Sequence, residues 1–482
     1  MTRDDVRTVR VLIVGAGFAG LGMAAVLDRA GDRDFLVLEQ GAGVGGTWRD
    51  NTYPGCACDI PSVQYSYSFA PGDGWTTARA AQPEILGYLR GVAAGFRDRI
   101  SFGARVAEGH WDEAGACWRV TTDGGRRYTA RYLVVATGAL TVPRLPRIPG
   151  AETFAGSAFH TAAWDHAVTL DGKRVAVIGT GASAVQVVPE IAARAAELHL
   201  YQRTPAWILP ARGARPPRLR RLARTAEYWR AEARVPAFAG PGPVASALHR
   251  RALRHLRRQV PDPALREMLT PQYRIGCKRI LHSDSYFPAL TGPGVEVVTA
   301  PIDRIVPDGV VTADGTRRAA EVLVYATGFR VAGALGRLPL VGRDGVTLQQ
   351  RWQDRGVRAH LGIAVAGLPN LFLLSGPNTG LGHNSVLFMI ESQIRYVQDA
   401  MVAVERAGAA ALEVRDRVQE ASHDDVQRRL SGAVWSTGGC ASWYLDGRGV
   451  NHALWPGASW RYRWRTRRVS LADYHLTHLR PR

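Results

Sequence analysis

The chain has 482 residues, of which 46% are hydrophobic and 21% are charged. This composition is ordinary for a protein with large buried cores, and the length leaves room for about three domains. The net charge is +19, but Lys173 and Lys278 are the only lysines among 61 basic residues. Arginine has replaced lysine almost everywhere, so we interpret the charge as coding bias and predict no nucleic-acid partner.

The cysteines argue against a disulfide framework, because their number is odd and no two form a C-x-x-C pair. They are Cys56, Cys58, Cys117, Cys277 and Cys440. The C-x-C spacing of Cys56 and Cys58 is not that of the redox pair in flavin disulfide reductases, so we expect small packed thiols. A reducing compartment is therefore predicted.

The N-terminal residues and the apolar runs of the sequence bear on targeting and on membrane insertion. Residues 1–10 are charged and lead directly into a strand, and no later apolar run approaches the roughly 18 residues of a membrane span. We therefore predict a cytoplasmic protein without a membrane span, and we predict no metal site.

A strand, a glycine turn and a helix are predicted over residues 9–27, VRVLIVGAGFAGLGMAAVL. The turn has the G-x-G-x-x-G pattern, which allows a tight turn, close approach of a pyrophosphate and close packing of helix on strand. Its glycines are Gly15, Gly17 and Gly20. Glu39 follows 24 positions after Gly15, where a carboxylate can accept hydrogen bonds from a ribose diol. This segment predicts an FAD site.

A similar segment covers residues 173–191, KRVAVIGTGASAVQVVPEI. Its turn has the G-x-G-x-x-A form of the pattern, with Gly179, Gly181 and Ala184 at the three positions. Arg203 stands 24 positions after Gly179 and is followed by Thr204. A guanidinium there can bind a 2'-phosphate through two hydrogen bonds, so the second segment predicts an NADPH site.

Two further buried strands end in the same Ala-Thr-Gly tripeptide, at residues 132–138 and 322–328, and we expect each to close one dinucleotide domain. Pro143, Pro146 and Pro149 mark the crossing between the domains. We predict an α/β protein with two Rossmann-like dinucleotide-binding domains. The FAD domain is discontinuous, at residues 1–142 and 332–482, and the NADPH domain spans residues 143–331.

Within the NADPH domain, a helical insertion is predicted at about residues 212–270, which are rich in Arg, Ala and Leu and broken by prolines. The arginines of this stretch could form an interaction face for an acidic partner or a membrane surface. We favour a solvated helical insertion.

The segment FAGSAFHTAAWD at residues 154–165 matches the fingerprint F-x-G-x-x-x-H-T-x-x-W-[P/D]. The matching residues are Phe154, Gly156, His160, Thr161, Trp164 and Asp165. Along nearly its whole length the chain resembles the class B flavoprotein monooxygenases, and this motif is that of the Baeyer-Villiger type. The resemblance implies that the motif links the two domains and takes part in domain movement. A lone histidine could instead be a catalytic base, but we do not expect His160 to act in that way.

Three further segments carry the resemblance. GVGGTWRDNTYPGCACDIPS at residues 43–62 is similar to the segment that wraps the flavin. The resemblance implies that FAD is surrounded by Thr47, Trp48, Asp59 and Tyr65. In YRIGCKRIL at residues 273–281, it implies that Lys278 holds the 2'-phosphate of NADPH and that Arg279 is the catalytic residue beside the flavin. From composition alone, Arg279 would be one more surface arginine.

The C-terminal segment at residues 440–457 resembles the aromatic stretch near the nicotinamide, with Trp443 as the matching tryptophan, although plain packing is the alternative. The segment departs from the compact N-x-P-G-K pattern of many cyclic-ketone enzymes, so it does not identify the substrate. Asn378 and Asn384 either contact the cofactor or cap the following helix.

The resemblance implies an NADPH- and O2-dependent Baeyer-Villiger oxidation of a small carbonyl compound to an ester or lactone through a C4a-peroxyflavin. That adduct must stay ionised, which requires a fixed cation. A unit charge at about 4 Å and an effective dielectric near 20 contributes roughly 4 kcal/mol. Arg279 would supply the charge and Asp59 would orient it. The alternatives are oxygenation of sulfur or nitrogen, and a flavin reductase that does not oxygenate. The sequence does not indicate an oligomeric state.

Overall fold

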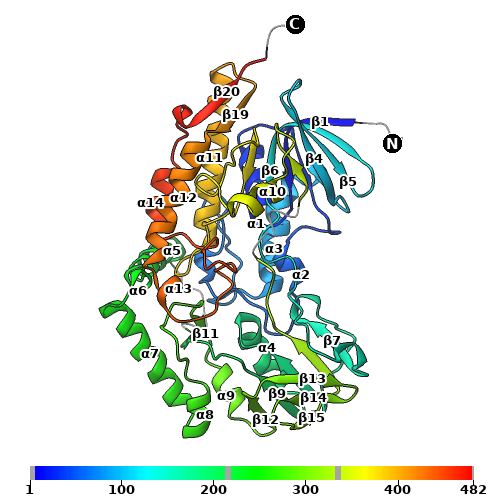
Figure 1. The fold of residues 1–482 in the computed structure, drawn as a ribbon, viewed down its shortest axis with the longest axis vertical. Helices are drawn as coiled ribbons and strands as arrows, with labels where there is room; N and C mark the ends of the chain where they lie inside the picture. Colours follow the sequence, from blue (N-terminus) through cyan, green and yellow to red (C-terminus); the bar gives the residue numbers. More distant parts are fainter. Residues whose placement is uncertain (1–5, 212–218, 332–337, 480–482) are drawn as a thin grey trace.

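The computed structural model describes residues 6–211, 219–331 and 338–479. Its two large sheets lie one above the other in Figure 1. Residues 212–218 of the predicted insertion and the start of the second FAD-domain segment, residues 332–337, fall outside the described residues.

The first sheet is built around β1, whose run of buried valine, leucine and isoleucine pairs on both sides with parallel neighbours. The described strand order is β17-β4-β5-β6-β1-β2-β3, and β18 also pairs with β6. The strands are β1 (Val6–Val14), β2 (Phe35–Leu38), β3 (Ile100–Ser101), β4 (Val106–Asp112), β5 (Cys117–Thr122), β6 (Arg127–Val135), β17 (Leu340–Val341) and β18 (Leu371–Leu373). The sheet therefore combines strands from residues 6–135 with strands from residues 340–373.

The second sheet is parallel throughout, and its strand order is β12-β9-β8-β16-β7. Its strands are β7 (Ser157–His160), β8 (Arg174–Ile178), β9 (Glu197–Tyr201), β12 (Val295–Val298) and β16 (Val322–Tyr325). An antiparallel sheet lies beside it, formed by β13 (Ile302–Val306), β14 (Gly309–Thr312) and β15 (Arg317–Ala319). The α/β class is confirmed.

Helices follow the two glycine turns and pack on the sheets. They include α1 (Phe18–Arg29), α2 (Thr47–Asp50), α3 (Gln82–Ala93), α4 (Ala182–Ala192), α9 (Tyr286–Leu290) and α10 (Leu348–Arg355). Every residue of α1 except Val26, Asp28 and Arg29 is buried, as expected for a helix pressed onto a sheet.

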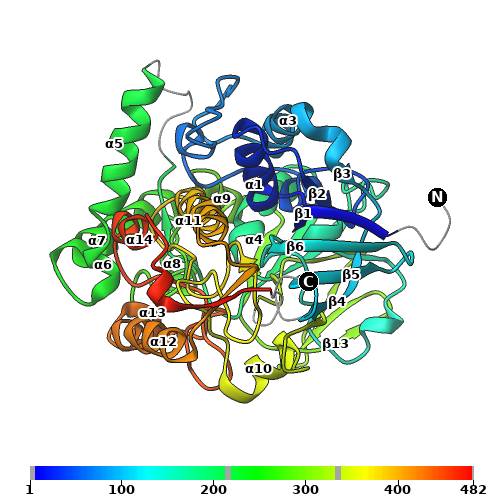
Figure 2. The same ribbon diagram turned by 90° about the horizontal axis from the view of Figure 1, so that it is seen from above.

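Residues 219–270 contain α5 (Arg220–Glu232), α6 (Pro236–Ala239), α7 (Pro243–Gln259) and α8 (Pro263–Met268). They lie on the side of the molecule that also carries the C-terminal helices (Figures 1 and 2). Those helices are α11 (Val386–Arg406), α12 (Asp416–Ser431), α13 (Val434–Thr437) and α14 (Ser459–Arg465). Phe238 and Trp435 stack at 5.4 Å between ring centroids, so the two regions share one core.

The remaining strands are short. β10 (Ile208–Leu209) pairs with β11 (Leu281–His282), and β19 (Ala411–Val414) pairs with β20 (Tyr474–Thr477). None of the helices in the described ranges is both long enough and apolar enough to cross a bilayer.

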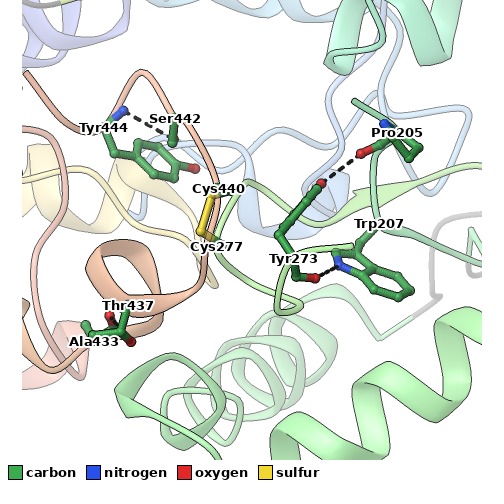
Figure 3. The surroundings of a disulfide bond; sticks show 9 residues. All are labelled: Pro205, Trp207, Tyr273, Cys277, Ala433, Thr437, Cys440, Ser442 and Tyr444. Carbon is green, nitrogen blue, oxygen red and sulfur yellow. Dashed lines mark hydrogen bonds between the residues drawn. A yellow bond between two sulfur atoms is a disulfide. The ribbon is translucent and has the colours of Figure 1, made fainter. Parts of the chain in front are cut away.

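Cys277 and Cys440 form a disulfide, with their Cα atoms 6.1 Å apart (Figure 3). The argument against disulfides is wrong for this pair, because 163 residues separate the two cysteines and no short spacing reveals them. Cys56, Cys58 and Cys117 are free, and the burial of Cys56 and Cys58 confirms that they are packed thiols.

Candidate active site

A cavity of about 1870 Å³ extends from the first glycine turn to the second. A pocket for one drug-sized ligand measures roughly 300–1,000 Å³. The cavity is lined by both glycine turns, by the loop before β11 and by the C-terminal aromatic segment. It therefore has room for two dinucleotides that meet between the sheets.

The first glycine turn presents bare backbone to this cavity. Gly15 has φ +106°, and a Cβ there would lie 2.6 Å from the carbonyl oxygen of Ala136. A Cβ at Gly20 would overlap the Gly15 carbonyl, whereas at Gly17 it would meet only the Gly46 Cα at 3.8 Å. Gly15 and Gly20 thus serve packing, and Gly17 leaves the open approach that a pyrophosphate needs.

Glu39 is buried, and its carboxylate is held by three donors. Oε2 accepts the Ala16 amide at 2.8 Å, and Oε1 accepts the Gly41 amide at 2.8 Å and Arg49 Nη1 at 2.7 Å. Arg49 was missed by the sequence analysis. The sequence pointed to Arg49 only through its position directly after Thr47 and Trp48, which were predicted to surround FAD.

Thr47, Trp48 and Tyr65 line the same end of the cavity. Trp48 Nε1 donates to the Tyr65 hydroxyl at 3.1 Å, and the Tyr65 ring lies 5.0 Å from that of Phe18 in α1. Burial raises the pKa of Tyr65, so its hydroxyl stays protonated. Trp48, Tyr65 and Phe18 thus form an aromatic wall on this side of the cavity.

The second glycine turn is more open. A Cβ at Gly179 would overlap the Ala326 carbonyl, but a Cβ at Gly181 would meet nothing within 4 Å. Ala184 is fully buried in α4 against the sheet. The turn therefore leaves a free surface where a second pyrophosphate fits.

Arg203, Thr204 and Lys278 line the cavity beside this turn. Burial, and then repulsion from Arg203, lowers the pKa of Lys278. Across the described ranges, neither cation has a carboxylate within ion-pair distance. Two unneutralised cations at one end of a cavity suit a phosphate dianion.

Arg279 and Asp59 meet across 220 residues of sequence. Arg279 Nε donates to Asp59 Oδ2 and Nη2 to Oδ1, each at 2.7 Å. The attraction of Asp59 raises the pKa of Arg279. Burial alone would raise the pKa of Asp59, but the charge and hydrogen bonds of Arg279 outweigh it and lower that pKa. Arg279 is thus a fixed cation in the cavity rather than a free surface arginine.

The aromatic segment contributes Trp443 and Tyr444, whose ring centroids are 4.4 Å apart. Both line the cavity, but Trp443 is 47% exposed whereas Tyr444 is 2% exposed. Burial raises the pKa of Tyr444 to about 12, although the nearby Arg279 acts to lower it. Tyr444 was missed, because adjacent aromatic residues carry no sign of which one turns inward.

Neither Asn378 nor Asn384 caps α11, because Ser385 is its N-cap. Asn378 Nδ2 donates to the carbonyl of Asn451 at 2.7 Å, away from the cavity lining. Asn384 lines the cavity and donates to Glu232 Oε1 at 2.8 Å.

Glu232, at the end of α5, is a third residue that the sequence analysis missed. It is 7% exposed and also accepts from Ser459 Oγ at 2.6 Å, while its Oε1 lies 3.2 Å from His383 Nε2. Burial works against ionisation, yet His383 and the other partners lower the pKa of Glu232. The helical insertion is therefore tied to the cavity wall at Asn384.

The fingerprint residues do not line the cavity. His160 ends β7, and its Nδ1 accepts the Ala162 amide at 3.0 Å. Burial lowers the pKa of His160. Thr161 is buried, and the Trp164 ring packs against Phe159 at 5.0 Å. Phe154 packs against the core of the second sheet, Gly156 approaches the Glu321 carbonyl, and Asp165 accepts the Ala167 amide.

The loop at residues 53–57, which follows α2, is held against α4 of the second glycine turn by Gln186. Its Oε1 accepts the Tyr53 hydroxyl at 2.8 Å, and its Nε2 donates to the Ala57 carbonyl at 2.8 Å. Gly55 packs so closely that a Cβ would lie 2.6 Å from the Gln186 carbonyl. The two glycine turns are therefore held in one frame.

Comparisons with known proteins agree with this geometry. Residues 12–215 match the family model described as pyridine nucleotide-disulphide oxidoreductase. A Pseudomonas aeruginosa protein named Baeyer-Villiger monooxygenase is 45% identical over 485 residues, which cover 98% of this chain and 92% of the relative.

Among solved structures, an oxidized steroid monooxygenase bound to NADP is 31% identical, with a TM-score of 0.86 and coverage of 98% of this chain and 100% of its own. A complex of OTEMO with FAD and NADP is 27% identical, with a TM-score of 0.87 and coverage of 98% and 100%. The predictions of fold class, of a flavoprotein monooxygenase and of FAD and NADPH as its cofactors are confirmed, and the chain belongs to the Baeyer-Villiger monooxygenase family.

Proposed function

We propose that this FAD- and NADPH-dependent Baeyer-Villiger monooxygenase converts a small ketone to an ester or lactone, with Arg279 as the catalytic cation. The observation that carries the proposal is the bidentate Arg279–Asp59 pair, inside a cavity that joins the two glycine turns. When bound, FAD supplies the activated oxygen after reduction by NADPH.

At the first turn, the open backbone at Gly17 fits the FAD pyrophosphate, and Glu39 lies beside it to receive the ribose. Trp48 and Tyr65, joined by a hydrogen bond, offer an aromatic wall to the cofactor at this end. At the second turn, Gly181 leaves room for the NADPH pyrophosphate, and Arg203 with Lys278 binds the 2'-phosphate.

Arg279 stabilises negative charge on oxygen atoms beside it, including the oxyanion that develops from the substrate carbonyl. Asp59 orients the guanidinium by occupying Nε and Nη2, which leaves Nη1 without a carboxylate partner among the described residues. Asp59 also offsets part of the charge of Arg279, so it is a positioning residue.

The first experiment incubates the holoenzyme with NADPH, isotopically labelled O2, and a panel of linear, cyclic and aryl ketones plus thioethers. We expect labelled esters or lactones from the wild type, loss of these products in Arg279→Ala, and partial recovery in Arg279→Lys. Arg119→Ala is the matched control, because it removes a surface pair with Asp112 and neither residue lines the cavity. Labelled sulfoxides alone would reassign the protein to heteroatom oxygenation, and unchanged ester formation in Arg279→Ala would refute the role of Arg279.

We also propose that the FAD domain comprises residues 1–142 and 332–482 and the NADPH domain residues 143–331. The division is supported by the first sheet, which takes β17 and β18 from the second of the two FAD-domain segments. A cytoplasmic location is proposed as well: three free cysteines support a reducing compartment, whereas the Cys277–Cys440 disulfide is unusual for one.

A further inference from the structure

The disulfide lies at the junction of two parts of the candidate active site. Cys277 immediately precedes Lys278 and Arg279, and Cys440 is three residues before Trp443. Figure 3 shows the bond between the loop that starts at Tyr273 and the segment that leads to Tyr444. The covalent bond thus joins the proposed cationic residues to the aromatic ones.

The loop that carries Cys277 is anchored at its other end by hydrogen bonds (Figure 3). The Tyr273 hydroxyl donates to the Pro205 carbonyl at 3.0 Å, and Trp207 Nε1 donates to the Tyr273 carbonyl at 2.9 Å. Pro205 follows Arg203 and Thr204. The loop is therefore held to the strand end that supplies the other proposed phosphate ligands.

The segment on the other side of the bond has few anchors of its own. Within the described ranges, the backbone of residues 439–441 makes no hydrogen bond to another segment. The preceding residue, Gly438, accepts the Arg274 amide at 2.9 Å, and a Cβ on it would lie 2.8 Å from Cys277 Sγ. The bond to Cys440 is thus the main tie between residues 439–441 and the basic loop.

We propose that Cys277 and Cys440 are positioning residues, and that their disulfide holds the Trp443–Tyr444 segment against the Lys278–Arg279 loop so that NADPH consumption stays coupled to oxygenation. This role rests on the proposed function of Arg279 and Lys278. Reduction by a dithiol transfers two electrons and two protons, which breaks the S–S bond, leaves two thiols and oxidises the dithiol to its own disulfide.

Access to the two sulfur atoms differs. Cys277 is 1% exposed, whereas Cys440 is partly exposed. An external thiolate therefore attacks Cys440, and Cys277 leaves as the thiolate. In a reducing compartment such bonds are usually transient, so the pair makes the coupling of the enzyme responsive to the thiol pool.

The test compares oxidised holoenzyme, dithiothreitol-reduced holoenzyme, Cys440→Ser and Cys277→Ser, with Cys117→Ser as the matched control on β5. Alkylation and peptide mass spectrometry report the bond, hydrogen exchange reports residues 438–450, and the rate at which the enzyme releases peroxide from NADPH and O2 in the absence of ketone reports uncoupling. We expect reduction of the disulfide, and equally Cys440→Ser or Cys277→Ser, to increase hydrogen exchange in residues 438–450 and the rate of peroxide release several-fold. Dithiothreitol should have no further effect on Cys440→Ser, and Cys117→Ser should behave as wild type.

Two outcomes would overturn the proposal. One is thiols at both positions that do not pair when the holoenzyme is treated with glutathione disulfide. The other is a bond whose reduction changes neither hydrogen exchange nor peroxide release. Both readouts need no ketone, so they stay informative even if the enzyme oxidises none of the ketones tested and the proposed function fails.

Discussion

The two glycine turns have nearly the same backbone pattern, but the protein supplies more partners for the charged side chains at the first turn than at the second. At the first turn, Glu39 is buried with three donors on its carboxylate, and a Cβ at Gly17 would touch Gly46 at ordinary van der Waals distance. At the second, Gly181 faces open space, and Arg203 and Lys278 have no carboxylate partner among the described residues. We infer that the first site is preorganised for a resident cofactor, and that the second is completed by an anionic ligand that comes and goes.

Adding a methyl group to the third glycine of the first turn and to the second glycine of the second turn gives the largest contrast; the third position of the second turn is already an alanine, Ala184. Gly20→Ala should yield protein without bound flavin or without a stable fold, because its Cβ would overlap the Gly15 carbonyl and the backbone cannot yield easily. Gly181→Ala should keep its flavin absorbance and raise KM for NADPH, since the methyl group occupies only the ligand's space. Flavin content after gel filtration and steady-state kinetics check both. Loss of flavin from Gly181→Ala would remove the distinction.

Removing a cation at the second site should have the next largest effect. Hydrogen bonds to charged groups contribute about 1.5–3 kcal/mol, so Arg203→Ala or Lys278→Met should raise KM for NADPH by roughly 10- to 100-fold. KM for NADH should change little, because NADH lacks the 2'-phosphate. Equal effects on the two nucleotides would show that these residues do not read the phosphate.

Removing the anion at the first site should act on stability instead. In Glu39→Gln, Arg49 loses the buried one of its two carboxylate partners and keeps only the pair with the more exposed Asp50. We expect a loss of about 1–3 kcal/mol in the free energy of unfolding, together with slower flavin uptake and an unchanged preference for NADPH over NADH. Urea unfolding of the holoenzyme measures the first effect. A changed nucleotide preference would contradict the separation of the two sites.

The smallest effect is expected from pH. Burial and Arg203 lower the pKa of Lys278 from 10.5, so the ammonium loses its proton at a lower pH than an ordinary lysine. KM for NADPH should therefore begin to rise in the alkaline range below pH 10.5, and Lys278→Arg should abolish that rise because arginine stays charged. KM profiles of the two enzymes against pH test this, and parallel profiles would argue against Lys278 as a phosphate ligand.

Much of the fold could be predicted, and so could the meeting of both glycine turns with Glu39 and Arg203, because strand, turn and helix are local and the Glu39 and Arg203 spacings are fixed by the following strand. The fingerprint and the Arg279–Asp59 pair depended on family resemblance. Residues brought together from distant segments were missed. Cys277 and Cys440 have no local signal, and neither the role of Arg49 beside Glu39 nor the burial of Glu232 can be read from an arginine-rich chain.

The Gln186 contact sets a rule for recombining this enzyme with its relatives. The side-chain amide of Gln186 and its backbone carbonyl, which packs against Gly55, hold the loop at residues 53–57. This loop comes from the part of the chain that also carries the first glycine turn. A chimera whose crossover falls between residues 58 and 182 takes the loop and α4 from different parents. Such a junction keeps the contact only where one parent supplies the tyrosine and the glycine of the loop and the other supplies the glutamine of α4, so module exchange is governed by these three positions as well as by the linker.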